Sequence, residues 1–393
     1  MIPVAEALAR VLALARPLPA ETVGLRAAAG RVLAAPVAAD RDQPPFAASA
    51  MDGYALADPA GPGDRFRVIG TAPAGAAFQG RVGPGEAVRI FTGAPVPPGA
   101  TRVVIQEDVT PLPEAIVLGD RLDGGPNIRA AGRDFRAGQV LTAPRRLRPV
   151  DLGLLAAMNV DRVPVTRRPV VAVIATGDEL VMPGETPRAD QIIASNGFAI
   201  AALAQARGAE ARLLPIARDT EADLMATLAL AAGTDLIVTI GGASVGDHDL
   251  VGRVAESLGL DRAFYKIAMR PGKPLMAGRL HGVPMLGLPG NPVSSLVCTH
   301  LFLLPLIDAL LGLPAGPPAR ARARLTCDLG PNGPREHYMR ARLVPGPDLP
   351  GIDPFADQDS ARLWLMAEAD ALLIRPVDDG PRPAGTVVDY LPI

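Results

Sequence analysis

The run Val-Val-Ala-Val-Ile-Ala (170–175), followed by Thr-Gly-Asp-Glu-Leu (176–180), sets the architecture of this chain. Six consecutive apolar residues before a polar, glycine-bearing turn predict a strand that is buried on both faces. The pattern returns at residues 235–240 and at residues 285–288, and helical patterns lie between these runs. Residues 169–315 therefore predict an α/β domain with a parallel sheet covered on both faces.

Each of these strands ends in a turn that suits an anion. The turns are Thr-Gly-Asp-Glu-Leu (176–180), Gly-Gly-Ala-Ser-Val-Gly-Asp-His-Asp (241–249) and Gly-Leu-Pro-Gly-Asn-Pro-Val-Ser (287–294). Glycines let backbone N–H groups approach an anion closely, and the helices that follow add a favourable dipole. One such turn is weak evidence, but three at the carboxyl edge of one sheet predict a phosphate-containing ligand.

Three carboxylates accompany these turns, namely Glu179, Asp219 and Asp249. Carboxylates beside a phosphate site indicate Mg²⁺, which prefers oxygen ligands and bridges protein to phosphate. Asp219 and Asp249 each also suit the N-cap of the helix that follows. Acid–base hydrolysis by paired carboxylates without a metal is the alternative chemistry.

The cations of the chain point to the same region. Only two of the 39 basic residues are lysines, Lys266 and Lys273, and both lie in the segment 265–274. A lysine ammonium is a compact point charge, suited to an oxyanion held at a glycine turn. Pro and Gly bracket this segment, so we favour an anion-binding role over coincidence.

The remaining chain divides into three further regions. Short β-prone runs alternate with Gly/Pro turns in residues 44–140, which predicts an inserted β domain. Residues 1–43 and 141–168 flank this insert and predict a discontinuous helical and linker domain, with helices near 3–16 and 150–159. Residues 316–393 follow a Gly-Pro-Pro-Ala linker and predict a C-terminal β domain. The predicted class is therefore α/β plus all-β, in a multidomain subunit.

Composition limits the function classes. The formal net charge is −2 and basic residues are dispersed, which argues against nucleic acid as a partner. Two cysteines without a CxxC spacing argue against a zinc or iron–sulfur site and fit a reducing cytoplasm. The long apolar run 296–313 contains His300, Pro305 and Asp308, so we expect a buried helix and no membrane span.

These motifs together resemble the molybdopterin molybdotransferase family, which includes the bacterial MoeA proteins and the E domain of gephyrin. The resemblance rests on the three turns above and on further motifs in family order, which span nearly the whole chain. They are Ser-Ala-Met-Asp-Gly-Tyr-Ala (49–55), Thr-Gly-Ala-Pro (92–95), Asn-Ile-Arg (127–129) with Gly-Arg-Asp (132–134), and Arg-Pro-Gly-Lys-Pro (270–274).

The resemblance implies an elongated four-domain subunit and a homodimer, in which the partner's insert completes the active cleft. It implies insertion of molybdate into adenylylated molybdopterin, with hydrolysis of the pyrophosphate link, release of AMP and help from Mg²⁺. Molybdopterin adenylyltransferase and molybdoenzyme maturation proteins are implied as partners.

By motif, the resemblance assigns catalytic roles to Asp52, Glu179, Asp219, Asp249 and Lys266, and metal binding to Glu179, Asp219 and Asp249. It assigns substrate binding to a larger set: Thr92, Asp134, Thr176, Gly241, Gly242, Ser244, Gly246, Arg270, Lys273, Pro289, Asn291, Arg340 and Ser360. Arg270 stands where some relatives have lysine, and Arg133 replaces an acid.

Three alternatives stay open at this stage. The chain could be a non-catalytic dimeric scaffold, although its acids are present. It could be a molybdopterin adenylyltransferase, although such proteins resemble the α/β domain alone. A relative that handles tungstate fits equally well, because tungstate and molybdate nearly match in charge and size.

Overall fold

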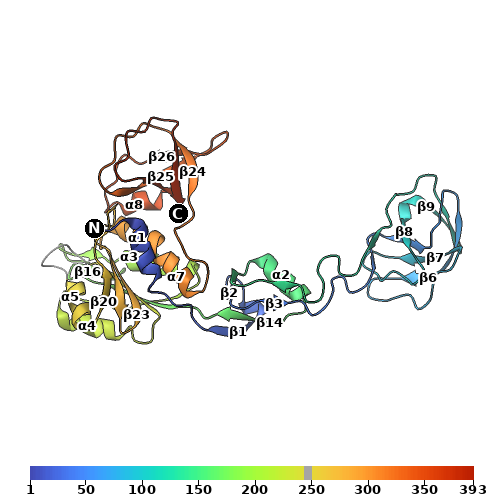
Figure 1. Cartoon of the computed structure of the whole chain (residues 1–393), viewed down its shortest axis with the longest axis horizontal. Helices are drawn as coiled ribbons and strands as arrows, with labels where there is room; N and C mark the ends of the chain where they lie inside the picture. Colours follow the sequence, from blue (N-terminus) through green and yellow to red (C-terminus); the bar gives the residue numbers. More distant parts are fainter. Residues whose placement is uncertain (243–249) are drawn as a thin grey trace.

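The computed structural model describes residues 1–242 and 250–393. Figure 1 shows an elongated molecule in which the chain forms four bodies. The α/β domain and the C-terminal β domain are stacked at one end, a small linker domain lies in the middle, and the inserted β domain lies at the far end. The predicted class, α/β plus all-β in an elongated subunit, is confirmed.

The α/β domain is built on a six-stranded sheet with the order β18-β15-β19-β23-β22-β20. Its strands are β15 (Val170–Ala175), β18 (Glu210–Leu213), β19 (Leu236–Ile240), β20 (Asp261–Phe264), β22 (Met276–Leu280) and β23 (Val283–Leu288). Strands β18, β15, β19 and β23 are parallel, but β22 is antiparallel to both of its neighbours, β23 and β20, so the prediction of a parallel sheet is wrong at this edge. Between β22 and β23 the cause is the two-residue turn formed by His281 and Gly282, which both have positive φ (50° and 84°). So short a turn can only join an antiparallel hairpin.

Each face of this sheet has its own helices, because successive side chains of a strand point to opposite faces. The helices of one face are α1 (Val4–Leu12), α3 (Asn196–Ala206), α6 (Pro292–Cys298) and α7 (Leu304–Leu310). Those of the other face are α4 (Glu221–Ala229) and α5 (Leu250–Ser257). The sequence predicts this N-terminal helix as part of the linker domain; that prediction is wrong, because the buried side chains Val4, Leu8 and Val11 of α1 belong to the α/β core.

Residues 292–310 form one long helical segment in that core. Among the residues that the structure describes, it is the one helix long and apolar enough to cross a membrane, yet 83% of its most apolar window is buried inside the protein. A π-helical turn, η3 (Thr299–Leu303), lies just before Pro305. Proline has no N–H to give to the preceding turn, and the wider turn accommodates it. The segment is a buried core helix, as the sequence predicted.

The linker domain contains more strand than we expected. Its elements are β1 (Ala20–Gly24), η1 (Leu25–Ala27), β2 (Val32–Leu33), β3 (Val37–Ala38), β12 (Val140–Leu141), β13 (Arg145–Arg146), α2 (Pro149–Ala157) and β14 (Arg162–Thr166). Four of the strands form a sheet with the order β1-β14-β2-β13. Its core places Val163 and Val165 of β14 against Leu33 and against Leu155 of α2. Alternate valines on β14 favour a half-buried strand over a helix.

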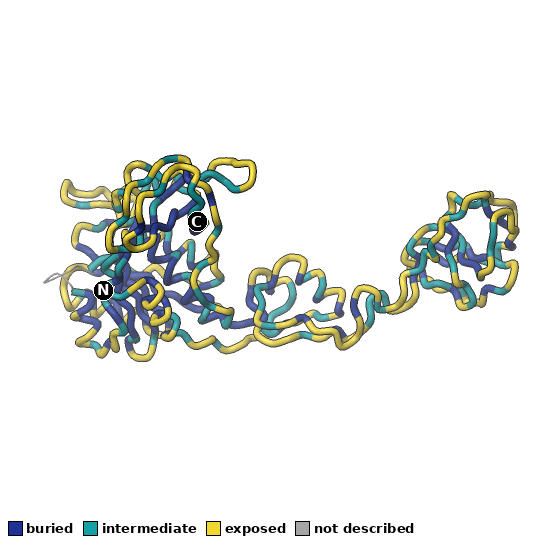
Figure 2. The backbone as a smooth tube through the Cα atoms, turned by 45° about the horizontal axis from the view of Figure 1, so that its top comes forward, coloured by how far each residue is buried: buried dark blue, intermediate teal, exposed yellow. Residues whose placement is uncertain are grey.

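The inserted domain is a six-stranded sheet with the order β8-β5-β7-β6-β10-β9. Its elements are β4 (Ala48–Ser49), β5 (Gly53–Leu56), β6 (Arg65–Ala72), β7 (Glu86–Ile90), β8 (Arg102–Ile105), η2 (Gln106–Asp108), β9 (Val109–Leu112), β10 (Ala115–Leu118) and β11 (Ile128–Arg129). Figure 2 shows buried segments inside the inserted domain, while the two chain segments that connect it to the linker domain are mostly exposed.

The C-terminal domain is a β domain, as predicted, and it includes one strand from the α/β domain. Its elements are β21 (Met269–Arg270), β24 (Ala321–Leu325), β25 (Glu336–Val344), β26 (Gly351–Pro354), α8 (Leu363–Ala367), β27 (Ala371–Arg375) and β28 (Val387–Pro392). The order is β21-β25-β26-β24-β28-β27, and a further pairing of β25 with β27 closes the sheet on itself. Because β21 follows β20 in the chain, its pairing with β25 ties the two domains together.

An ion cluster joins the linker domain to the α/β domain. The Asp308 carboxylate of α7 accepts from Arg146 Nη2 at 3.2 Å and from Arg207 Nε at 2.9 Å. Arg146 belongs to the linker sheet and also donates to the Gly30 carbonyl at 3.1 Å. The Asp308 side chain is only 11% exposed, so one carboxylate faces two guanidinium groups in a mostly buried setting.

Replacing Asp308 by asparagine should destabilise the folded protein by about 2 kcal/mol, because two half-buried guanidinium groups lose their shared counter-charge. Calorimetric unfolding would measure the change. A matched control is Asp190→Asn, which removes an ion pair whose side chains are 68% and 73% exposed and should leave the transition unchanged. If both variants changed the unfolding transition equally, the proposed stabilising role of the Asp308 ion cluster between the two domains would be wrong.

Candidate active site

Three parallel strands end at one level of the sheet. Ala175 of β15 is the register partner of Ile240 of β19, which in turn is the partner of Leu288 of β23. The turns that follow these residues therefore start side by side, which is the arrangement predicted for an anion site at the carboxyl edge.

Two of the predicted glycines are required by this geometry. Gly241 and Gly242 have φ of +90° and +63°, a backbone region that side chains with a Cβ rarely adopt. A Cβ on Gly241 would lie 2.8 Å from the Thr176 carbonyl oxygen, and a Cβ on Gly242 would lie 2.4 Å from Val251 Cγ2. The backbone can pack this closely between β15 and α5 only without side chains.

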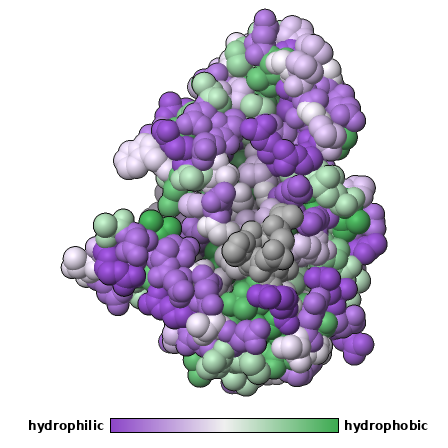
Figure 3. Space-filling view, turned by 90° about the vertical axis from the view of Figure 1, so that its left-hand side faces the viewer, coloured by the Kyte–Doolittle hydropathy of each residue, from purple (hydrophilic) through white to green (hydrophobic). Residues whose placement is uncertain are grey.

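A cavity of about 840 Å³ opens above these strand ends. Figure 3 faces this end of the molecule, where hydrophilic side chains predominate on the surface. The lining comes from the strand ends, the starts of α3 and α6, α5 and the C-terminal domain: Ala175, Thr176, Gly177, Glu179, Leu180, Ile192, Ile193, Ala194, Ser195, Asn196, Gly197, Asp219, Ile240, Gly241, Gly242, Leu250, Arg253, Pro274, Pro289, Gly290, Asn291, Pro292, Ser294 and Ala361. Seven predicted site residues are in this set: Glu179, Asp219, Thr176, Gly241, Gly242, Pro289 and Asn291.

The predicted acid Asp219 does not cap a helix. The N-cap of α4 is Thr220, whose Oγ1 accepts from the backbone N–H of Asp223 at 3.2 Å. Asp219 instead exchanges hydrogen bonds with Asp178: its N–H donates to Asp178 Oδ1 at 3.1 Å, and its Oδ2 accepts from the Asp178 N–H at 3.4 Å. The capping alternative is therefore wrong for Asp219, which lines the cavity together with Glu179.

Other predicted residues of the second turn cannot be placed. Ser244, Gly246 and Asp249 lie outside the described residues, as does His248. Within the described ranges, no group of three or more His, Cys, Asp or Glu side chains is arranged to hold a metal ion. The predicted trio of metal ligands is represented here by Glu179 and Asp219 alone.

The predicted cations Lys266, Arg270 and Lys273 are not part of the cavity lining. Arg270 is in β21 and pairs with β25, while Pro274 brings the end of this segment to the cavity wall. Lys266 Nζ lies 5.4 Å from the centre of the Tyr265 ring. Among the ion pairs of the described residues, none involves Lys266, Arg270 or Lys273.

Arg340 occupies a different position from the one expected of a substrate contact. It is 1% exposed, and its guanidinium donates to the carbonyls of Arg362 and Asp357, both at 3.2 Å. Burial lowers its pKa. Because these bonds direct the guanidinium into the C-terminal domain, Arg340 holds a loop and presents no charge to the cavity. Ser360, on that loop, accepts from Asn291 Nδ2 at 2.9 Å.

The three predicted residues of the N-terminal half lie far from the cavity within one chain. Asp52 and Thr92 are in the inserted domain at the opposite end of the molecule, and Asp134 is in the connection between insert and linker (Figure 1). Asp52 Oδ1 accepts from the Thr92 N–H at 2.7 Å and from Thr92 Oγ1 at 2.8 Å. These bonds, the backbone one first, lower the pKa of Asp52.

Sequence reasoning missed several lining residues. Asn196, at the start of α3, donates to the Gly290 carbonyl at 2.7 Å and so joins two of the turns. Ile192 and Ile193 form an exposed apolar part of the wall. Arg253 of α5 is the basic residue of the described lining. Its place one turn into a helix gave no sequence signal, since only the packing of α5 brings it to the strand ends.

The remaining titratable core residues take no part in this site. Cys298 is fully buried, which raises the pKa of its thiol and makes it unreactive. Desolvation lowers the pKa of His300 and of His337 to about 4 in each case, so both are neutral at physiological pH.

Gly242→Ala should destabilise the protein by at least about 2 kcal/mol, because the added Cβ meets a buried valine as well as an unfavourable φ. Gly233→Ala is the matched control: its φ is +78°, but nothing lies within 4 Å of the position that a Cβ would take. It should cost about 1 kcal/mol, as φ strain alone. Thermal unfolding of both variants would test the difference, and indistinguishable transitions would argue against the close packing at Gly242.

The whole chain is similar to proteins of molybdenum cofactor synthesis. Family models match residues 2–159 (MoeA N-terminal region, domains I and II), 172–309 (probable molybdopterin binding domain) and 322–393 (MoeA C-terminal region, domain IV). The chain is 36% identical over 375 residues to the molybdopterin molybdenumtransferase of Nostoc sp., covering 91% of this chain and 85% of that protein. It is 33% identical over 402 residues to the Bacillus subtilis molybdopterin molybdenumtransferase, covering 99% and 94%.

The structural comparison agrees with the sequence comparison. A crystal structure of the molybdopterin biosynthesis MoeA protein from Pyrococcus horikoshii matches with a TM-score of 0.83 at 30% identity, covering 100% of this chain and 99% of that one. The family resemblance read from the motifs is thus confirmed over all four domains. The chain belongs to the MoeA family of molybdopterin molybdenumtransferases.

Proposed function

We propose that this protein inserts molybdate into adenylylated molybdopterin, with hydrolysis of the pyrophosphate link and release of AMP, in molybdenum cofactor synthesis. The observation that carries this proposal is the cavity above three aligned strand ends, lined by glycine turns and by two carboxylates, in a chain that matches the family from end to end. The proposal includes a cytoplasmic location and contacts with molybdopterin adenylyltransferase and molybdoenzyme maturation proteins.

The polar floor of the cavity suits a pyrophosphate. Gly242 and Gly290 line it without side chains, so phosphate oxygens can approach the backbone closely at the strand ends. Backbone N–H groups at such turns stabilise phosphate oxygens without adding bulk. The apolar wall of Ile192 and Ile193 supplies a surface for a heterocycle on the same ligand.

Mg²⁺ fits the donor set of this cavity. Glu179 and Asp219 both line it, and neither carboxylate is in an ion pair with a described side chain. Mg²⁺ favours oxygen ligands and is usually held by one or two carboxylates together with the phosphates of a substrate. Bound there, the ion would neutralise pyrophosphate charge, and we propose Asp249 as a third ligand.

The chain's own groups would then bind and orient the reactants. The turns hold the pyrophosphate, and the carboxylates of Glu179 and Asp219 position the water that attacks it. We propose Lys266, Arg270 and Lys273 as the cations that attract the tetrahedral oxyanion, since no carboxylate among the described residues forms an ion pair with them.

We further propose that the active unit is a homodimer, in which the insert of one subunit completes the cavity of the other. Asp52 and Thr92 are held in one defined arrangement, yet they lie far from the cavity of their own chain. The elongated shape leaves the insert free to reach a second copy. This arrangement would bring the N-terminal motifs and the α/β motifs to the same substrate.

Turnover tests the reaction directly. With adenylylated molybdopterin, Mg²⁺ and molybdate, the wild-type protein should release AMP, and tungstate in place of molybdate tests the other oxyanion. Glu179→Gln and Asp219→Asn should each lower kcat by about a hundredfold or more, because each removes a cavity carboxylate charge. Glu221→Gln, two residues beyond Asp219 but outside the cavity lining, should retain wild-type rates. AMP release at the same rate with and without molybdate or tungstate would refute the proposal. Wild-type turnover by the Glu179→Gln variant would refute it as well.

Mixing two inactive variants tests the shared site. Asp52→Ala and Glu179→Ala are each expected to be inactive alone, but their heterodimer contains one site with both residues intact. Random assembly should therefore restore about a quarter of the wild-type activity. No recovery, despite heterodimers detected by native mass spectrometry, would mean that Asp52 does not act in the partner's cavity.

A further inference from the structure

One loop of the C-terminal domain reaches the cavity. This loop, residues 355–362, follows β26 and ends at α8, and its residue Ala361 lines the cavity. Every other described lining residue belongs to the α/β domain. The position of the loop therefore decides the shape of one cavity wall.

The loop is held to the start of α6 by two hydrogen bonds to Ser360, one to its side-chain hydroxyl and one to its backbone carbonyl. Asn291 is the N-cap of α6, but its side chain makes no cap bond to its own helix. Its Nδ2 donates instead to Ser360 Oγ at 2.9 Å, and the Val293 N–H donates to the Ser360 carbonyl at 3.1 Å. An asparagine at this position ordinarily satisfies its own helix, so the bonds to Ser360 show that α6 is capped from the C-terminal domain.

Gln358 fixes the same loop from the other side. Its Oε1 accepts from the Arg340 backbone N–H at 3.0 Å and from Arg340 Nε at 3.4 Å. Its Nε2 donates to the carbonyls of Arg340 at 3.0 Å and of Phe355 at 2.8 Å. The side-chain amide thus pairs with β25 as another peptide group would. The Arg340 guanidinium completes the arrangement through the carbonyls of Asp357 and Arg362.

We propose that Gln358 is a positioning residue for the active site. By holding residues 355–362 on β25, it keeps Ser360 bonded to Asn291 and keeps Ala361 in the cavity wall. It is not itself part of the cavity lining and acts through the loop. The proposal rests on the proposed function for its kinetic consequence, while the structural coupling from Gln358 to the start of α6 is independent of the reaction.

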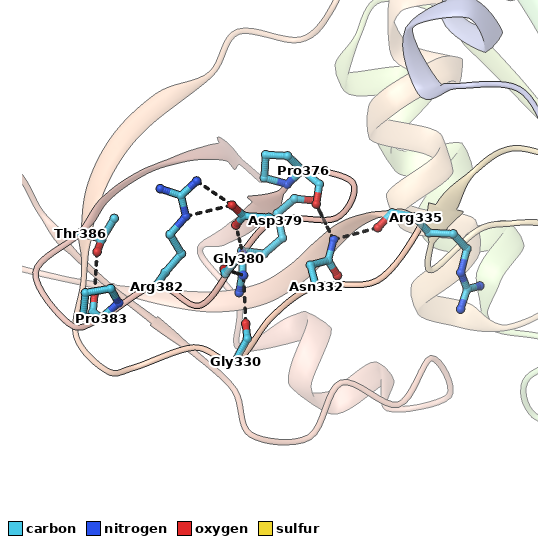
Figure 4. Close-up of polar contacts among 10 residues, drawn as sticks. Gly330, Asn332, Arg335, Pro376, Asp379, Gly380, Arg382, Pro383 and Thr386 are labelled. Atoms are coloured by element: carbon cyan, nitrogen blue, oxygen red, sulfur yellow. Dashed lines mark hydrogen bonds and ion pairs between the residues drawn. The ribbon is translucent and has the colours of Figure 1, made fainter.

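The C-terminal domain offers a matched control in a second amide clamp. Asn332 Nδ2 donates to the carbonyls of Arg335, Arg375 and Pro376 at 2.9, 3.3 and 2.6 Å. Figure 4 shows this clamp beside the ion pairs of Asp379. It also holds one loop to another by a side-chain amide, but none of these residues lines the cavity. Loss of either clamp should therefore destabilise the domain, and only loss of Gln358 should alter the cavity.

Gln358→Ala should raise KM for adenylylated molybdopterin by about tenfold with a much smaller change in kcat, because a displaced wall weakens substrate binding before the chemical step. Asn332→Ala should change KM by less than about twofold. Gln358→Glu keeps the acceptor for Arg340 but loses both Nε2 donors, so it should give an intermediate KM. If Gln358→Ala folds poorly, Gln358→Glu provides the test of the proposal in its place.

Hydrogen exchange supplies a readout that does not depend on turnover. In Gln358→Ala, the Val293 amide should exchange faster, because its acceptor on Ser360 is released, whereas Asn332→Ala should leave this amide protected. Equal KM changes in the two alanine variants, or an unaltered Val293 amide in Gln358→Ala, would overturn the inference. If wild-type protein releases no AMP, the proposed function fails, and the exchange comparison still decides whether Gln358 holds the loop.

Discussion

The common register of β15, β19 and β23 is the constraint on which the rest of the site depends. Parallel pairing sets the three strand ends at one height, so three turns start within reach of one ligand. The glycines at 241 and 242 are a consequence of this, since the turns are too close to one another and to α5 for a Cβ. A slip of one residue in any pair would exchange the side chains that face the two apolar cores, and the close packing of each core against its own helices opposes this exchange.

Contacts between domains convert this edge into a cavity. Strand β21 leaves the α/β domain to join the C-terminal sheet, and the loop containing Ser360 returns to the start of α6. On the opposite side, Asp308 links the linker sheet to α7 through two arginines. These contacts are polar and specific, whereas the connection to the insert is exposed and slender (Figure 2). The α/β domain is therefore held by specific contacts to both the C-terminal domain and the linker domain, whereas the insert is joined only through the slender connection.

The separation of the insert from the cavity is the structural argument for the two-subunit site that we propose. The Asp52 carboxylate is fixed by two donors of Thr92, and Arg89 lies over the rings of Tyr54 and Phe91 nearby. Such order on an exposed face is consistent with recognition of another surface. Within one chain these groups lie at the other end of the molecule from Glu179, and this separation is the basis of the homodimer that we propose.

Local pattern was enough to predict most elements and the family, because apolar runs, turn glycines and long motifs are encoded by neighbouring residues. The strand 170–175, the buried helix 292–310 and the glycine turns all follow from such signals. Tertiary packing decided the rest. The antiparallel edge at β22, the place of α1 in the α/β core, and the buried position of Arg340 depend on partners far away in the sequence or on a turn of two residues. Hydrogen bonds and close packing between distant segments leave no periodic trace in a sequence. The structure alone therefore shows that the Arg340 guanidinium holds a loop and that the Asn291 side chain bonds to Ser360 of the neighbouring domain.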